Sequence, residues 1–222
     1  MMNEQEMGVV SRHISRCRKA IQELQSGVYS DDFRDAWDTF LTEFGKAMSK
    51  TIDLSIRHPA TRENGHRLKK AHAKDDYGLV YLRVARNMES HTLTPPARYR
   101  DANFSVKGFL NFGIAKGTAG EVTFDDCWVE DPDGVRHIDH AHVKFEAGQR
   151  PVISGAPPED LWFQNGSVDL EAVTAEDRKT YGKPTFLMGT PLDAGTPDEL
   201  ALAAMSYLET YLVELKKVFP NL

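Results

Sequence analysis

Apolar residues recur at steps of three and four in four stretches of the chain, which is the pattern of an amphipathic helix. The pattern predicts helices over residues 3–26, from about 30 to 58, from about 76 to 91, and over 197–219. Ser30, Asp31 and Asp32 supply an N-cap for the second helix, and Thr196-Pro197 opens the last one. The segment 62–74 is strongly basic and only weakly periodic, so we expect a connector there.

The period changes to two between the third and fourth predicted helices. Alternation from Phe104 to Ile114 indicates one strand, and the segments 121–130 and 135–146 flank Asp-Pro-Asp-Gly, 131–134, which is typical of a hairpin turn. A short strand is expected at Thr185–Met188. The pattern therefore predicts an antiparallel meander of about three strands.

The last helix needs a surface to cover its apolar side, and the first three helices supply one. We therefore expect a mainly α protein: one domain over residues 1–222, built as a four-helix up-down bundle of residues 3–93 and 197–219. The β-rich meander, about residues 98–190, would then be an insertion between the third and fourth helices.

Composition narrows the classes of protein that fit. The chain has 222 residues and a formal net charge of −6, which argues against a surface that coats nucleic acid but leaves room for one basic site. Cys17 and Cys127 lie far apart, so no disulfide framework and a cytoplasmic location are expected. We see no secretory signal and no apolar run long enough for a membrane span.

The third predicted helix carries two stripes. Its core stripe contains Tyr77, Val80, Tyr81, Val84 and Met88. A second stripe contains Leu79, Leu82 and Arg86. A second, partly apolar stripe on a bundle helix is typical of a partner surface, so we expect these three residues at a homodimer interface.

The end of this helix carries residues suited to RNA cleavage. His91 is the side chain able to move a proton near neutral pH, Arg86 offers a permanently charged fork for phosphate oxygens, and Asn87 can orient the histidine or donate to phosphate. Asn87 and His91 share a helix face, whereas Arg86 and His91 are roughly 140° apart. Arg86 and His91 could still meet if the long arginine side chain extends around the helix. They could also meet if each of two chains contributes one of these residues to a shared cleft.

The segment Arg86-Asn-Met-Glu-Ser-His91, at the end of the third bundle helix, resembles the motif of the HEPN (higher eukaryotes and prokaryotes nucleotide-binding) domain family. The resemblance covers the bundle, about half of the chain. It implies a metal-independent endoribonuclease without a cofactor, whose site is shared across a homodimer with both copies of Arg86 and His91. The resemblance also suggests a toxin or defence effector whose activity is blocked by an inhibitory partner protein.

Two other interpretations stay open. The first is a non-catalytic HEPN-like dimeric module that binds an unknown ligand. The second leaves the motif without function, with His91 as a last-turn histidine that is favourable to the helix dipole and Arg86 as a surface arginine. A further match at the same spacing, Arg67 to His72, is interpreted as coincidence.

Two more groups of residues are candidates for binding. Basic residues near the third helix could steer an RNA backbone, or could simply be solvated: Arg83, Arg67, Lys69, Lys70 and Lys74. On the hairpin, His140 and His142 share a face and Asp125 should lie opposite His140. These three are weak candidates for a metal site of a hydrolase, and a solvent-facing strand surface is the alternative.

Overall fold

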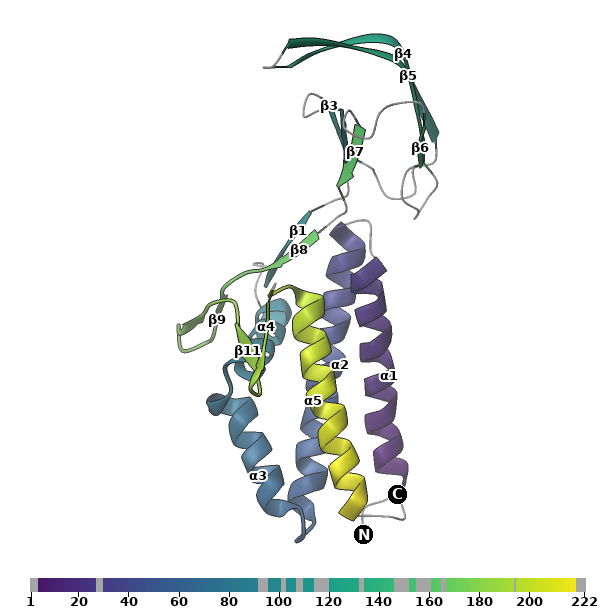
Figure 1. The fold of residues 1–222 in the computed structure, drawn as a ribbon. Coiled ribbons are helices and arrows are strands. Elements are labelled where there is room, and N and C mark those ends of the chain that lie inside the picture. The colour runs from purple at the N-terminus through teal and green to yellow at the C-terminus, as the bar shows by residue number, and fades with distance from the viewer. Residues whose placement is uncertain are drawn as a thin grey trace. The chain divides into compact units, whose positions relative to one another are not determined.

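The computed structural model describes residues 4–26, 30–91, 96–100, 103–106, 110–113, 120–131, 134–145, 152–154, 161–164, 167–193 and 195–218. The chain forms two compact units (Figure 1). Unit 1 contains residues 1–26, 34–98 and 168–222, and unit 2 contains 27–33 and 99–167. The expected insertion of about residues 98–190 is therefore divided, because residues 168–190 belong to the helical unit.

All four expected helices are present, and all of them lie in unit 1 apart from residues 30–33 of α2. They are α1 (Glu4–Ser26), α2 (Ser30–Arg57), α4 (Tyr77–His91) and α5 (Pro197–Val218). The expectation of a connector over 62–74 is wrong, because this segment folds as α3 (Arg62–Lys70) followed by a π-helix, η1 (Ala71–Asp75). Its weak periodicity has a physical reason: α3 buries only Gly65 and Leu68.

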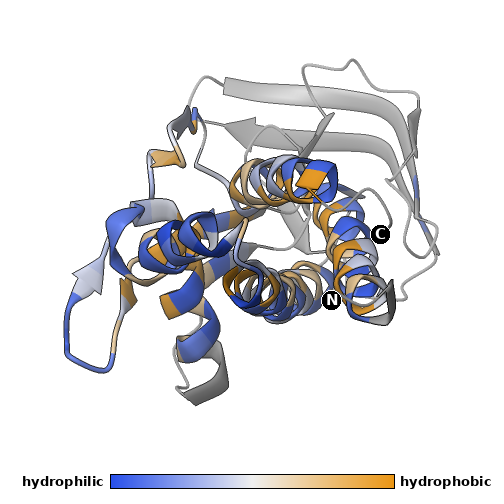
Figure 2. Ribbon diagram, turned by 90° about the horizontal axis from the view of Figure 1, so that it is seen from below, coloured by the Kyte–Doolittle hydropathy of each residue, from blue (hydrophilic) through white to orange (hydrophobic). Residues whose placement is uncertain are grey.

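The helices pack side by side around an apolar core (Figures 1 and 2). In α2 the rings of Trp37, Phe40 and Phe44 are stacked and almost fully buried, with centroids 5.6 and 5.5 Å apart. Two ion pairs show that α1 and α2 are antiparallel: His13 Nδ1 lies 2.6 Å from Glu43 Oε2, and Arg57 Nη1 lies 2.7 Å from Glu6 Oε1. In Figure 1, α1 begins and α5 ends at the same end of this unit.

Asp76 joins the start of α4 to a neighbouring turn. Its Oδ1 accepts a hydrogen bond from the Leu79 amide (2.9 Å), which is an N-cap, and its Oδ2 accepts one from the Met188 amide (2.7 Å). Met188 belongs to the turn between β11 (Phe186–Leu187) and β12 (Thr190–Pro191), which form an antiparallel pair. The short strand expected at Thr185–Met188 is thus confirmed, and it packs on α4.

A second small hairpin of unit 1 lies against α4. It consists of β9 (Val173–Thr174) and β10 (Thr180–Tyr181), paired antiparallel. The Thr174 amide donates to Met88 Sδ of α4 at 2.9 Å. Just before it, β8 (Ser167–Leu170) pairs with β1 (Ala97–Arg100). The Tyr81 hydroxyl donates to the Glu171 carbonyl at 2.6 Å, so the core face of α4 contacts the residues between β8 and β9.

Unit 2 contains two three-stranded antiparallel sheets. One is ordered β3 (Leu110–Gly113), β2 (Asn103–Val106), β7 (Leu161–Gln164), and the other β4 (Gly120–Asp131), β5 (Gly134–Phe145), β6 (Val152–Ser154). The β4–β5 hairpin has the expected register, with Asp131 opposite Gly134. The single strand expected from Phe104 to Ile114 is wrong, because β2 and β3 fold back on each other with Phe104 opposite Phe112.

The second stripe of α4 is not a free surface. Leu79 is 0% exposed and Leu82 is 2% exposed within the single chain. Arg86, on the same side, packs against α2, because a Cβ added at Gly45 would lie 2.6 Å from Arg86 Nη1. The expectation that Leu79, Leu82 and Arg86 form a dimer interface is therefore corrected: both leucines are buried within one chain, and Arg86 packs against α2 of that chain. Among the described residues, no helix is long and apolar enough to cross a membrane.

Candidate functional site

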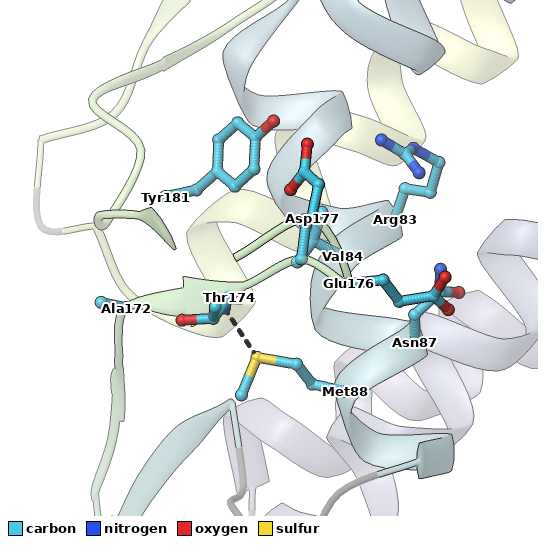
Figure 3. A pocket seen from close by; sticks show the side chains of 10 residues that line it. Arg83, Val84, Asn87, Met88, Ala172, Thr174, Glu176, Asp177 and Tyr181 are labelled. Atoms are coloured by element: carbon cyan, nitrogen blue, oxygen red, sulfur yellow. Dashed lines mark hydrogen bonds between the residues drawn. The ribbon is translucent and has the colours of Figure 1, made fainter. Parts of the chain in front are cut away.

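A pocket of about 620 Å³ lies in unit 1 between α4 and the β9–β10 hairpin (Figure 3). One wall is formed by α4, with Arg83 and Asn87 as its polar residues, and Val84 and Met88 as its apolar residues. The other wall comes from the hairpin: Ala172, Thr174, Ala175, Glu176, Asp177 and Tyr181. The pocket volume falls within the roughly 300–1,000 Å³ that is typical of small-ligand sites.

Arg83 is the basic residue of the α4 wall. Its Nη2 donates to the Ala73 carbonyl of η1 at 3.2 Å, which holds the arginine beside the π-helix. Its Nε is buried and has no hydrogen-bond acceptor among the described residues. Arg83 lines the pocket and has no carboxylate partner in the described part of the chain, so its guanidinium is suited to bind an anion such as phosphate.

Arg86 is turned away from this pocket and contacts its neighbour Asn87. The Nη2 atom of Arg86 donates to Asn87 Oδ1 at 3.1 Å. Because the amide oxygen of Asn87 accepts this hydrogen bond, the amide nitrogen is directed elsewhere and its two protons remain for a ligand. Arg86 thus orients Asn87, which itself lines the pocket.

His91, the third expected catalytic residue, is the last residue of α4. Its side chain lies outside the described residues. Its position on the helix is nevertheless informative, since Arg83, Asn87 and His91 are spaced at steps of four and therefore follow one face of α4. We call these three residues the pocket stripe. Sequence reasoning chose Arg86 and placed Arg83 only among RNA-backbone contacts.

His72, whose match to Arg67 was interpreted as coincidence, interacts with the charges of Arg83 and Arg86. It lies half-buried in η1, and burial together with the positive charges of Arg83 and Arg86 lowers its pKa from 6.5 to about 4. His72 is therefore neutral at physiological pH beside two arginines. The segment is a π-helix, a rare conformation that often occurs at functional sites.

The lowered pKa of His72 predicts a pH-dependent stability. Between pH 6.5 and 4 the unfolded chain binds a proton at this residue and the folded chain does not, so the free energy of unfolding falls as the pH drops through this window. The loss is roughly 3 kcal/mol at most. Urea titrations at several pH values should show a clearly weaker dependence in His72→Gln.

Glu43 also makes the free energy of unfolding depend on pH, but in a different pH range. Burial acts to raise the pKa of Glu43, but the hydrogen bonds from Lys46 and His13 outweigh it and lower the pKa to about 2. The stabilisation from Glu43 is therefore lost only below pH 4.5, outside most of the His72 window. An unchanged pH dependence in His72→Gln between pH 4.5 and 6.5 would contradict the assignment to His72.

The acidic hairpin wall was also missed from the sequence. Asp177 Oδ1 accepts a hydrogen bond from the Lys179 amide at 3.0 Å, and the Arg178 amide donates to the Ala175 carbonyl at 2.9 Å. Arg178 has φ of 67°, a left-handed conformation that costs energy for a residue with a Cβ. The loop that carries Glu176 and Asp177 is therefore an ordered turn fixed by hydrogen bonds. The one signal in the sequence was the cluster Ala-Glu-Asp-Arg.

The expected RNA-contacting residues do not gather at this pocket. Arg67 pairs with Glu63 and lines a second pocket of about 530 Å³, together with Tyr207 and Tyr211. Lys70 pairs with Asp75 at 2.9 Å. Lys69 and Lys74 are exposed. Of the basic residues named, only Arg83 lines the pocket between α4 and β9–β10.

The weak metal candidates lie in unit 2. Asp125 is opposite His140 in the β4–β5 register, as expected, and His142 is opposite Thr123. The side chains of all three candidate residues lie outside the described ones. In the part of the chain whose side chains are described, no group of three His, Cys, Asp or Glu residues is arranged to hold a metal ion.

Comparison with protein-family models, with curated proteins and with solved structures finds no match to this chain. A proposal about function therefore rests on the residues of α4 and the pocket beside them.

Proposed function

We propose that this protein is a metal-independent endoribonuclease of HEPN type whose active site is the pocket stripe Arg83, Asn87 and His91. We also infer a HEPN-like up-down bundle in which α3, η1 and α4 together take the place of the third helix. One observation carries the proposal more than any other. Arg83 and Asn87 line one pocket, and His91 follows them at the same spacing on the same helix.

Each residue of the pocket stripe has one role in the proposed cleavage of RNA. The imidazole of His91 takes the proton of an RNA 2′-hydroxyl, and the 2′-oxygen then attacks the adjacent phosphorus. The bond from phosphorus to the 5′-oxygen breaks, and that oxygen takes a proton from water. Arg83 and the amide nitrogen of Asn87 donate hydrogen bonds to the phosphoryl oxygens as negative charge builds on them. The products carry a 2′,3′-cyclic phosphate and a 5′-hydroxyl.

Arg86 acts on this site as a positioning residue. Its hydrogen bond to Asn87 Oδ1 fixes which end of the amide faces a substrate, and its contact with Gly45 fixes the arginine. This assignment differs from the expectation that Arg86 itself binds phosphate. It also makes a composite site across a homodimer unnecessary, because the pocket stripe belongs to one chain.

Substitution of His91 tests the proposal. The His91→Ala variant is expected to cleave RNA about 10²–10⁴-fold more slowly than the unchanged protein in the presence of a chelator, since it lacks the proton acceptor. The matched control is His66→Ala, which removes an exposed histidine of α3. Single-turnover cleavage of a labelled RNA gives both rates, and circular dichroism checks the fold. Equal rates for the unchanged protein and His91→Ala would refute the site.

A further inference from the structure

The pocket has two walls of opposite charge, which a site for phosphate alone would not need. Arg83 and Asn87 present hydrogen-bond donors from α4, whereas Glu176 and Asp177 present carboxylates from the β9–β10 loop (Figure 3). A phosphate is attracted to the first wall and repelled by the second. The hairpin wall therefore suits a part of the ligand that is uncharged and rich in N–H donors.

Tyr181 adds a flat aromatic surface to the hairpin wall. Its ring is half-buried and is held by two contacts: Tyr77 lies at a centroid distance of 5.8 Å with the planes tilted by 59°, and Lys179 Nζ lies 4.9 Å from the ring centroid. The hydroxyl of Tyr77 donates in turn to the Gly182 carbonyl at 3.2 Å. A fixed aromatic ring in a pocket is the usual platform on which an RNA base stacks.

The two carboxylates have oxygens left for a ligand. One oxygen of Asp177 accepts the Lys179 amide, which leaves Oδ2, and the carboxylate of Glu176 has no partner among the described residues. Two neighbouring carboxylates are matched by a base that offers two adjacent N–H groups, one to each carboxylate. Guanine is the RNA base that offers two adjacent donor groups on its Watson–Crick edge, at N1 and N2, whereas adenine, cytosine and uracil each offer a single donor group there.

We propose that the hairpin wall is a guanine-binding subsite, in which Tyr181 stacks on the base, and Glu176 and Asp177 accept its N1 and N2 protons. The proposal rests on the proposed ribonuclease function only in that the base belongs to an RNA whose phosphate contacts Arg83 and Asn87. The loop is suited to this selectivity because the turn around Arg178 is fixed by backbone hydrogen bonds, so the carboxylates need little rearrangement on binding.

Nucleotide binding tests the subsite without any cleavage. Isothermal titration calorimetry with the four ribonucleoside 5′-monophosphates should give a dissociation constant for guanosine monophosphate at least tenfold below the other three. In the double variant Glu176→Gln/Asp177→Asn the four constants should agree within about twofold. Both side chains are exposed, so the fold should persist. The control Asp53→Asn, at an exposed position of α2, should keep the preference.

Mapping of cut sites in one RNA of mixed sequence supplies the second readout. A preference for cleavage next to guanines that is lost in the double variant supports the subsite. Cleavage without base preference, together with equal binding of the four nucleotides, overturns the subsite and leaves the ribonuclease standing. Guanine-selective binding by a protein that cleaves no RNA overturns the ribonuclease and leaves the subsite standing. A preference for guanine that survives in the double variant also overturns the subsite.

Discussion

Replacing Arg83 with glutamine is expected to lower kcat/KM for RNA cleavage by about 10²–10³-fold, the usual loss when one donor to a developing negative charge is removed. The reason is geometric. Arg83 lines the pocket, whereas Arg86 contacts Gly45 and Asn87. Steady-state kinetics on a labelled oligonucleotide measure the effect. The matched control, Arg12→Gln, alters an exposed arginine of α1 and should leave kcat/KM unchanged.

Mixing two inactive variants separates the one-chain site from the composite site expected from the sequence. If one chain supplies the whole pocket stripe, a mixture of Arg83→Gln and His91→Ala should be as inactive as each variant alone. Restored activity in the mixture would show that two chains share a site and would contradict the assignment. The burial of Leu79 and Leu82 favours the first outcome, because these leucines are covered within one chain.

The substitution Gly65→Ala is expected to lower the free energy of unfolding by about 2–3 kcal/mol. A Cβ at this position would lie 2.8 Å from the Ile56 backbone nitrogen, the Ile56 Cγ1 and the Ser55 Cβ. One of these neighbours is a backbone atom, so α2 and α3 would have to move apart. The segment η1 and the position of Arg83 depend on α3, since Arg83 donates to the Ala73 carbonyl. Activity should therefore fall together with stability.

The same substitution elsewhere in the chain serves as the control. A Cβ added at Gly8 of α1 meets nothing within 4 Å. The Gly8→Ala variant should therefore gain about 0.5–1 kcal/mol, because alanine loses less backbone entropy than glycine in a helix. Urea unfolding of both variants gives the two values. A Gly65→Ala variant as stable as the unchanged protein would show that α3 does not approach α2 this closely.

Much of the fold was predictable because its signals are local. The helices α1, α2, α4 and α5 follow from apolar periodicity and caps, and Asp76 does cap α4. The Asp-Pro-Asp-Gly turn set the β4–β5 register, including Asp125 opposite His140. The strand from Phe104 to Ile114 was wrong because alternation gives the face of each residue but does not show where a strand folds back.

The site was only partly predictable, because it depends on packing between distant segments. The stripe of Leu79 and Leu82 suggested a partner from the sequence, and only the folded chain shows that both leucines are buried within it. The choice between Arg83 and Arg86 likewise depends on which side of α4 faces α2. No local pattern places residues 176–181 opposite Asn87, since 89 positions separate Asn87 from Glu176.

The chemical nature of the RNA ends is the measurement that tests the central claim most directly. The purified protein is incubated with a defined RNA in excess chelator, and the fragments are analysed by mass spectrometry. Cleavage by His91 and the 2′-hydroxyl predicts 2′,3′-cyclic phosphate and 5′-hydroxyl ends, formed at an undiminished rate without metal ions. Fragments with 5′-phosphate and 3′-hydroxyl ends, or RNA that stays intact at stoichiometric protein across pH 5–9, would contradict it.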